Sequence, residues 1–91
     1  MPVIRKKVDI INKLGLHARA AAKLVGVTTT FQSQVRIGHP DKMVDGKSIM
    51  AIMMLAAGKG TTLGLELDGK DAKDAARAII ALIENRFDED E

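Results

Sequence analysis

The chain has 91 residues, no cysteine and a formal net charge of +2. Its length suits one domain spanning residues 1–91 with a single small core, and without cysteine it can hold neither a disulfide framework nor a thiolate metal site. The basic residues near the start are not followed by an apolar run of signal-peptide length, and no apolar run approaches the roughly 20 residues that cross a bilayer. The sequence therefore predicts a cytoplasmic protein.

The first half of the chain contains patterns typical of two strands, a helix and a short extended segment. Apolar residues recur at alternate positions from Ile4 to Ile10, which predicts a half-buried strand. Residues 12–15 have turn character, and Ala18 to Val27 carries an apolar face with helical spacing, which predicts a helix. A strand over residues 32–37 and an extended segment at residues 43–44 flank a short loop, so we expect a hairpin.

The second half adds two helices and one strand. Ser48 precedes the apolar run IMAIMMLAA and is placed to cap a short helix that ends at Gly58. Leucine occupies alternate positions from Thr62 to Leu67, which predicts a strand. Apolar residues at helical spacing between Ala72 and Ile83 indicate a final helix, and the acidic residues 88–91 are expected to form a frayed tail.

The predicted order of elements is β-α-β-β-α-β-α. This order contains a split βαβ arrangement, in which helices gather on one face of an antiparallel sheet. We therefore expect an α+β fold, with a four-stranded antiparallel sheet and three helices on one face.

The charges divide unevenly along the chain. Residues 1–47 carry nine Lys and Arg against three Asp and Glu, whereas residues 48–91 carry five against nine. A basic first half suits an acidic or phosphorylated partner, although such asymmetry is also common on solvated surfaces. A nucleic-acid partner is disfavoured, because the only aromatic residues are Phe31 and Phe87 and single-strand binders stack bases on aromatic rings.

Two glycine-containing segments resemble phosphate-binding loops but do not meet the spacing of that motif. The P-loop requires a glycine five residues before the glycine of its Gly-Lys pair, and Asp41 and Met53 stand at those positions before Gly46 and Gly58. The two histidines are far apart, and the acidic residues lack coordination spacing. The sequence therefore predicts neither a metal nor a cofactor.

His17 stands where the predicted turn meets the start of the first helix. The unpaired N–H groups of a helix N-terminus attract oxyanions, and imidazole is a nucleophile near neutral pH. A phosphoryl group on the ring would be stabilised by this helix end and by Arg19, and Gly15 would allow a turn sharp enough to expose the ring. By residue chemistry alone, His17 fits either this role or that of an ordinary surface or capping histidine.

The segments INKLGLHARAAAKLV and DGKSIMAIMMLAAGKG resemble the histidine phosphocarrier (HPr) family of the bacterial phosphotransferase system. The resemblance extends from the first strand to the last helix and implies an open-faced β-sandwich. It implies that His17 accepts a phosphoryl group from an enzyme I-type protein and donates it to an enzyme IIA-type protein, while Arg19 stabilises the phosphorylated state. Such a protein is a stoichiometric carrier and not an enzyme. Many members have proline where this chain has Ala20, which should cost little beyond local rigidity.

The resemblance also bears on the branch of the family. The segments GLHARAAAKLV and NRFDEDE resemble the nitrogen-related branch, called NPr. The alternatives are a sugar-uptake carrier and a regulatory binding module without phosphotransfer, and the second is disfavoured because His17 is retained.

The family resemblance implies that the second helix contacts partner proteins. The residues that match or extend the family's partner-facing surface are Lys23, Ile49, Met50 and Met53. Ile52 and Leu55 are expected to point into the core. Ser48 aligns with a serine that a dedicated kinase phosphorylates in some lineages, although a helix cap explains it as well. We expect a monomer with no membrane partner.

Overall fold

A computed structural model describes residues 3–91 of the chain. The four strands of its antiparallel sheet are β1 (Val3–Asp9), β2 (Gln34–His39), β3 (Lys42–Asp45) and β4 (Thr62–Asp68), in the order β1-β4-β2-β3. The helices are α1 (Ala18–Thr28), α2 (Ile49–Met53) and α3 (Ala72–Glu84), and a short 3-10 segment, η1 (Arg86–Asp88), follows them. The predicted α+β fold and its order of elements are confirmed.

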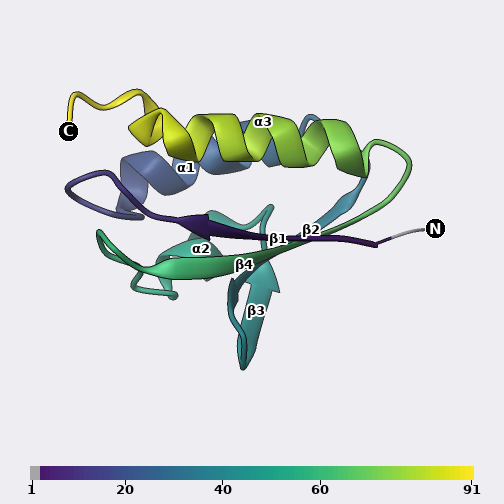
Figure 1. The fold of residues 1–91 in the computed structure, drawn as a ribbon, viewed down its shortest axis with the longest axis horizontal. Coiled ribbons are helices and arrows are strands. Elements are labelled where there is room, and N and C mark those ends of the chain that lie inside the picture. Colours follow the sequence, from purple (N-terminus) through teal and green to yellow (C-terminus); the bar gives the residue numbers. More distant parts are fainter. Residues whose placement is uncertain (1–2) are drawn as a thin grey trace.

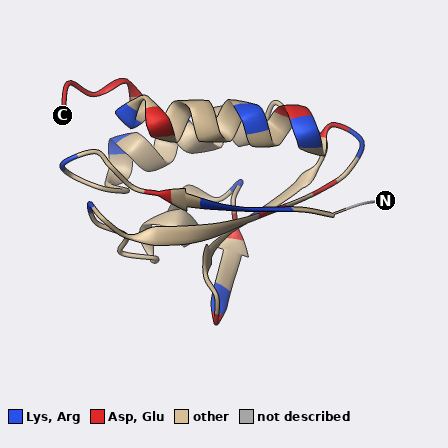
Figure 2. Ribbon diagram, viewed as in Figure 1, with Lys and Arg blue, Asp and Glu red and all other residues tan. Residues whose placement is uncertain are grey.

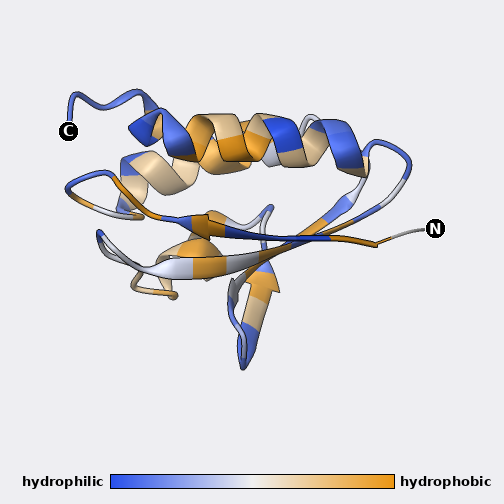
Figure 3. Cartoon of the chain, in the orientation of Figure 1, coloured by the Kyte–Doolittle hydropathy of each residue, from blue (hydrophilic) through white to orange (hydrophobic). Residues whose placement is uncertain are grey.

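The two faces of the sheet differ in polarity. Inward-facing residues of the central strands are almost completely buried: Val35, Ile37, Leu63, Leu65 and Leu67. The alternate positions face solvent, and Arg5 there forms an ion pair with Glu66 of the neighbouring strand at 3.4 Å. Because side chains of a strand alternate between faces, this pattern covers one face and leaves the other open. Figure 3 shows the hydrophobic colour on the strands and on the helices above them.

The helices bury their apolar faces against the sheet. Figure 1 shows α1 and α3 lying over the strands, and the two helices contact each other. The buried residues of α3 are Ala72, Ala75, Ala76, Ile79 and Ile83, which is the predicted stripe. Ile52 of α2 and the nearby Leu55 are also buried, as expected. Across residues 3–91, none of the helices has the length and apolar character that a bilayer crossing needs.

The second helix is shorter than its apolar run predicts. It ends at Met53 and not at Gly58. The N–H groups of Leu55 and Ala56 bond to carbonyls three residues earlier, and Ala56 adopts a φ of +51°, so the chain turns away from the helix axis. This turn brings the carbonyl oxygen of Ala57 within 2.9 Å of the N–H group of Leu16. Tertiary packing against the start of α1 thus overrides the helical pattern.

The acidic C-terminal segment is packed against the body of the protein, so the expectation of a frayed tail is wrong. Residues 86–88 have φ angles of +57°, +53° and +63°, and this left-handed turn reverses the chain after α3. Phe87 is completely buried, and Lys23 Nζ donates a hydrogen bond of 2.8 Å to its carbonyl oxygen. Apolar burial and backbone bonding hold the segment, which brings Glu89 and Glu91 to the turn before α1.

Gly15 and Gly26 provide a matched test of this packing. Gly15 has a φ of +68°, and an added Cβ would lie 2.4 Å from the carbonyl oxygen of Ala57. We predict that Gly15→Ala lowers the free energy of unfolding by about 1–3 kcal/mol, because the backbone must move. Gly26 lies within α1 with nothing within 4 Å of an added Cβ, so Gly26→Ala should raise it by about 0.5–1 kcal/mol. Urea denaturation measures both, and a Gly15→Ala variant as stable as the parent would contradict the close approach.

Candidate functional site

His17 is the N-cap residue of α1. Its backbone is extended, with φ −72° and ψ 177°, and its side chain makes no capping hydrogen bond. The N–H group of Ala21 donates to the His17 carbonyl oxygen at 2.9 Å and closes the first helical turn. The N–H groups of Ala18, Arg19 and Ala20 precede this bond and have no partner within the helix. The partial positive charge of the helix end therefore lies beside the imidazole.

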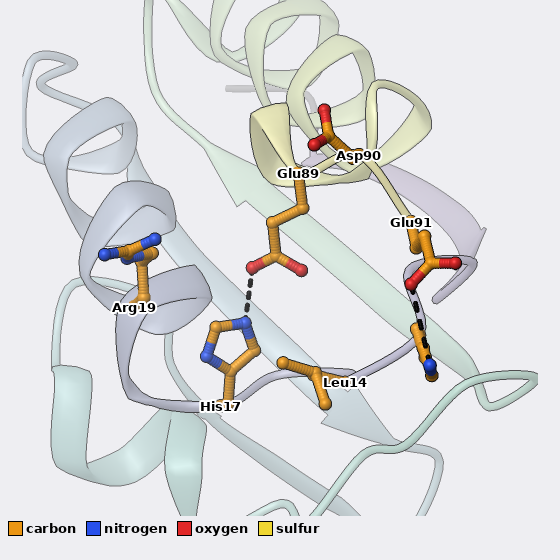
Figure 4. A pocket seen from close by; sticks show the side chains of 7 residues that line it. Leu14, His17, Arg19, Glu89, Asp90 and Glu91 are labelled. Atoms are coloured by element: carbon orange, nitrogen blue, oxygen red, sulfur yellow. Dashed lines mark hydrogen bonds and ion pairs between the residues drawn. The ribbon is translucent and has the colours of Figure 1, made fainter.

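A carboxylate from the C-terminal segment holds the imidazole ring. The Nε2 atom of His17 and the Oε2 atom of Glu89 form a hydrogen bond, shown as a dashed line in Figure 4. Their side chains are 28% and 16% exposed, so the contact is largely shielded from solvent. The contact joins residues 72 positions apart in the sequence.

Asn12 supports this carboxylate from below the surface. It is completely buried, and its Nδ2 donates to Glu89 Oε1 at 3.1 Å and to the carbonyl oxygen of Gly15 at 2.8 Å. The opposite amide orientation would direct the side-chain oxygen at these two oxygens, so the contacts fix how the amide lies. Its Oδ1 has no hydrogen-bond partner within residues 3–91. Asn12 therefore links the C-terminal segment to the turn that presents His17.

The pKa of the Glu89 carboxyl is lowered from its ordinary value of 4.5. Burial opposes ionisation, but the hydrogen bonds from Asn12 and His17, with the electrostatic attraction of His17 and Lys23, outweigh it. An ionised carboxylate only accepts hydrogen bonds, so the Nε2 atom that faces Glu89 carries the proton. In the neutral ring, the lone pair is then on Nδ1.

Arg19 stands next to the ring on the first turn of α1. Figure 4 shows the second ring nitrogen, Nδ1, on the side of Arg19 and opposite the dashed contact with Glu89. Arg19 forms no ion pair with any acidic residue that the structure describes. The residues that line the open pocket around the ring are Lys13, Leu14, His17, Arg19, Glu89, Asp90 and Glu91. An anion at Nδ1 would therefore meet the Arg19 guanidinium and the helix end.

The predicted regulatory serine and the predicted interface lysine do not have free side chains. Ser48 caps α2, since its Oγ accepts a hydrogen bond of 3.2 Å from the N–H group of Ala51. Lys23 bonds to the Phe87 carbonyl oxygen and lies 3.9 Å from a carboxylate oxygen of Asp88. Lys23 therefore holds the C-terminal segment in addition to lining the surface of α1.

The second helix exposes a group of large apolar side chains, which we call the apolar patch. The patch comprises Ile49, Met50, Met53 and Met54. Met50 is 75% exposed, and Leu14, in the turn before α1, is 66% exposed. Because Gly15 approaches Ala57, the turn that carries Leu14 and His17 lies against the segment that follows the patch.

Sequence analysis missed four contributors to this region: Asn12, Leu14, Met54 and Glu89. The length of the apolar run after Ser48 signals that some of it must be exposed, which could have found Met54. Leu14 is a lone apolar residue in a turn, a weaker signal of the same kind. No local pattern distinguishes Asn12 from a turn residue or Glu89 from a solvated acid.

No group of three or more His, Asp or Glu side chains is arranged to hold a metal ion anywhere in residues 3–91.

Known proteins similar to this chain share nearly its full length. Residues 4–85 match the PTS-HPr family, described as the PTS HPr component phosphorylation site. The phosphocarrier protein HPr of Pseudomonas aeruginosa is 59% identical over 100% of both chains, and the phosphocarrier protein NPr of Shewanella violacea is 40% identical over 98% of each. The crystal structure of HPr-C-His from Thermoanaerobacter tengcongensis has a TM-score of 0.92 at 39% identity, covering 97% of this chain and 99% of that chain.

The contact between Glu89 and His17 predicts a change in acid. Since the pKa of Glu89 is lowered in the folded protein, its contribution to stability is present above the ordinary value of 4.5 and is lost as the pH falls through the lowered pKa. An NMR titration of the Glu89 side chain should give a midpoint below 4.5. In the variant His17→Ala the midpoint should rise, because a hydrogen bond and a charge are lost. An unchanged midpoint would contradict the contact.

Proposed function

This chain belongs to the histidine phosphocarrier (HPr) family, and we propose that it accepts a phosphoryl group on His17 and passes it to another protein. The observation that carries the proposal is the orientation of the ring. The Nε2 atom of the ring is hydrogen-bonded to Glu89, while Nδ1 faces the side of Arg19 at the start of α1. The protein would then be a stoichiometric carrier that turns over no free substrate and needs no cofactor.

The transfer step balances without an additional reactant. The lone pair of His17 Nδ1 attacks the phosphorus of a donor phosphohistidine, the donor P–N bond breaks, and its electron pair returns to the donor ring. The new bond joins phosphorus to Nδ1, the proton stays on Nε2, and the His17 ring becomes a phosphoimidazolium. Unpaired N–H groups of α1 and the guanidinium of Arg19 stabilise the phosphoryl oxygens.

We propose an enzyme I-type protein as donor and an enzyme IIA-type protein as acceptor. Both must reach His17, and the exposed Leu14 and the apolar patch form the adjoining surface. Methionine side chains are flexible and polarizable, which suits a surface that meets two different partners. The hydrogen bond from Ala51 to Ser48 supports a capping role for that serine. A phosphate on Ser48 would instead place a dianion beside the patch and repel acidic partners.

Within the family, we propose the nitrogen-related phosphotransferase system. The segments GLHARAAAKLV and NRFDEDE support this branch, and one similar protein, at 40% identity, is named NPr. A sugar-uptake carrier is the second candidate, because relatives named HPr are more similar, with 59% identity for the one from Pseudomonas aeruginosa.

Phosphorylation in vitro tests the carrier function. With phosphoenolpyruvate and an enzyme I-type donor, the protein should gain the mass of one phosphoryl group, measured on the intact chain at alkaline pH, where phosphohistidine survives. His17→Ala should gain none. Arg19→Ala should react more slowly, by a factor of up to about ten, because charge stabilisation is lost. An unchanged gain in His17→Ala would refute the assignment.

The rates with two donors test the branch. We expect faster phosphorylation by a nitrogen-type donor than by a sugar-type donor, and the reverse order would favour the second candidate.

A charge in the apolar patch should interfere with both partners. We predict that Met50→Glu slows transfer to and from the protein by about tenfold, because a carboxylate is desolvated in each interface. Val3→Glu is the matched control, since Val3 is also an exposed apolar residue but lies at the start of β1. Rates should be measured beside urea unfolding curves. Equal rates for the two variants would remove α2 from the interface.

A further inference from the structure

We propose that Glu89 is a positioning residue for phosphotransfer, which holds the Nε2–H group of His17 and thereby keeps Nδ1 as the reacting nitrogen. The inference rests on the proposed function of His17 and adds the C-terminal segment to that site. A residue near the end of an acidic tail would then take part in the chemistry of a helix start 72 residues away.

The C-terminal segment is held by contacts that do not involve the ring. Its left-handed turn buries Phe87 completely, and Lys23 Nζ bonds to the Phe87 carbonyl oxygen at 2.8 Å. At its end, the N–H group of Lys13 donates to the Glu91 carbonyl oxygen at 2.5 Å. Glu89 lies between these two attachments, so its carboxylate is brought to His17 by the backbone on either side.

Asn12 fixes the carboxylate itself. Its Nδ2 bonds to Glu89 Oε1, which leaves Oε2 to accept from His17 Nε2. Because Asn12 is completely buried, the carboxylate has one immobile partner and one reactive partner. A group that orients a histidine in this way selects its tautomer.

The same contact serves both directions of transfer. Before phosphorylation, the carboxylate favours the tautomer with hydrogen on Nε2, which leaves the lone pair on Nδ1 for attack. After phosphorylation the ring is cationic, and the carboxylate stabilises that charge. In donation the P–N bond breaks, its electron pair returns to Nδ1, and neutral imidazole is left with the Nε2 proton still facing Glu89.

Other charged groups surround the ring, but Glu89 alone among the acidic residues of this pocket contacts it. Asp90 and Glu91 line the pocket from the same segment, and Glu91 lies 3.5 Å from Lys13 Nζ in an exposed ion pair. Arg19 lines the pocket from α1, and Lys23, further along the same helix, is bonded to the C-terminal turn. Glu91→Gln therefore removes the same charge as Glu89→Gln without touching the ring. It should also leave the stability nearly unchanged, because exposed ion pairs contribute little.

The test compares Glu89→Ala and Glu89→Gln with Glu91→Gln. In 15N spectra of the His17 ring in alkaline solution, the parent protein and Glu91→Gln should show hydrogen on Nε2 only. Glu89→Ala should show a mixture of the two tautomers, with Glu89→Gln between. Phosphorylation by an enzyme I-type donor should be slower in Glu89→Ala than in the parent, by a factor of up to about ten. In Glu91→Gln the rate should stay within about twofold of the parent rate. Thermal unfolding confirms that the variants are folded.

Two results from Glu89→Ala alone would overturn the role of Glu89. One is a parent-like tautomer in Glu89→Ala, and the other is a changed tautomer with an unchanged transfer rate. Both are distinct from a failure of the proposed function, in which the parent protein itself accepts no phosphoryl group. Slower transfer in Glu89→Ala and Glu91→Gln alike would also overturn the proposal, since it would assign the effect to the overall charge of the segment.

Discussion

The close packing of Gly15 against Ala57 determines where α1 begins and therefore where His17 lies. The backbone of Gly15 is left-handed, and the Leu16 N–H group bonds to the Ala57 carbonyl oxygen at 2.9 Å. The preceding chain is attached in the same way, since the N–H group of Gly60 bonds to the carbonyl oxygen of Ile10 at 2.7 Å. The segment between β1 and α1 is thus fixed along its length by the segment before β4. This constraint places the first turn of α1 beside the end of α2.

The same packing explains why an apolar surface adjoins the histidine. A helix of five residues can bury only one narrow face, and in α2 that face is Ile52. The remaining large side chains, including Met50 and Met54, stay exposed. Exposed apolar groups of this size are typical of surfaces that bind other proteins. The short helix therefore gives up burial in the core, and it presents its side chains next to the turn that carries His17.

The C-terminal segment brings the two oppositely charged halves of the chain together. Figure 2 shows its acidic colour at the end of the molecule where α1 begins. Its ion pairs with Lys13 and Lys23 are partly or fully exposed and each contributes at most about 1 kcal/mol. Burial of the Phe87 side chain contributes about 1.5–3 kcal/mol, so apolar packing accounts for most of the docking. The attachment of the backbone on either side of Glu89 decides which carboxylate meets the ring.

The sequence by itself determined the order of strands and helices, the start of α1 at His17 and the cap at Ser48. Each depends on residues close by in the sequence, through the alternation of apolar and polar residues, helical spacing and capping. It also indicated the core positions Ile52 and Leu55. The tertiary structure alone decided where α2 ends, because a contact with Leu16 draws the chain away after Met53.

It likewise decided that the acidic tail is part of the site. Glu89 lies 72 residues from His17 and 77 from Asn12, and an acidic terminal run has by itself the pattern of a solvated end. Only the burial of Phe87 and the left-handed turn around it direct Glu89 to the ring. Local patterns carry the energies of local structure, whereas this contact depends on packing that exists only once the sheet and its helices have formed.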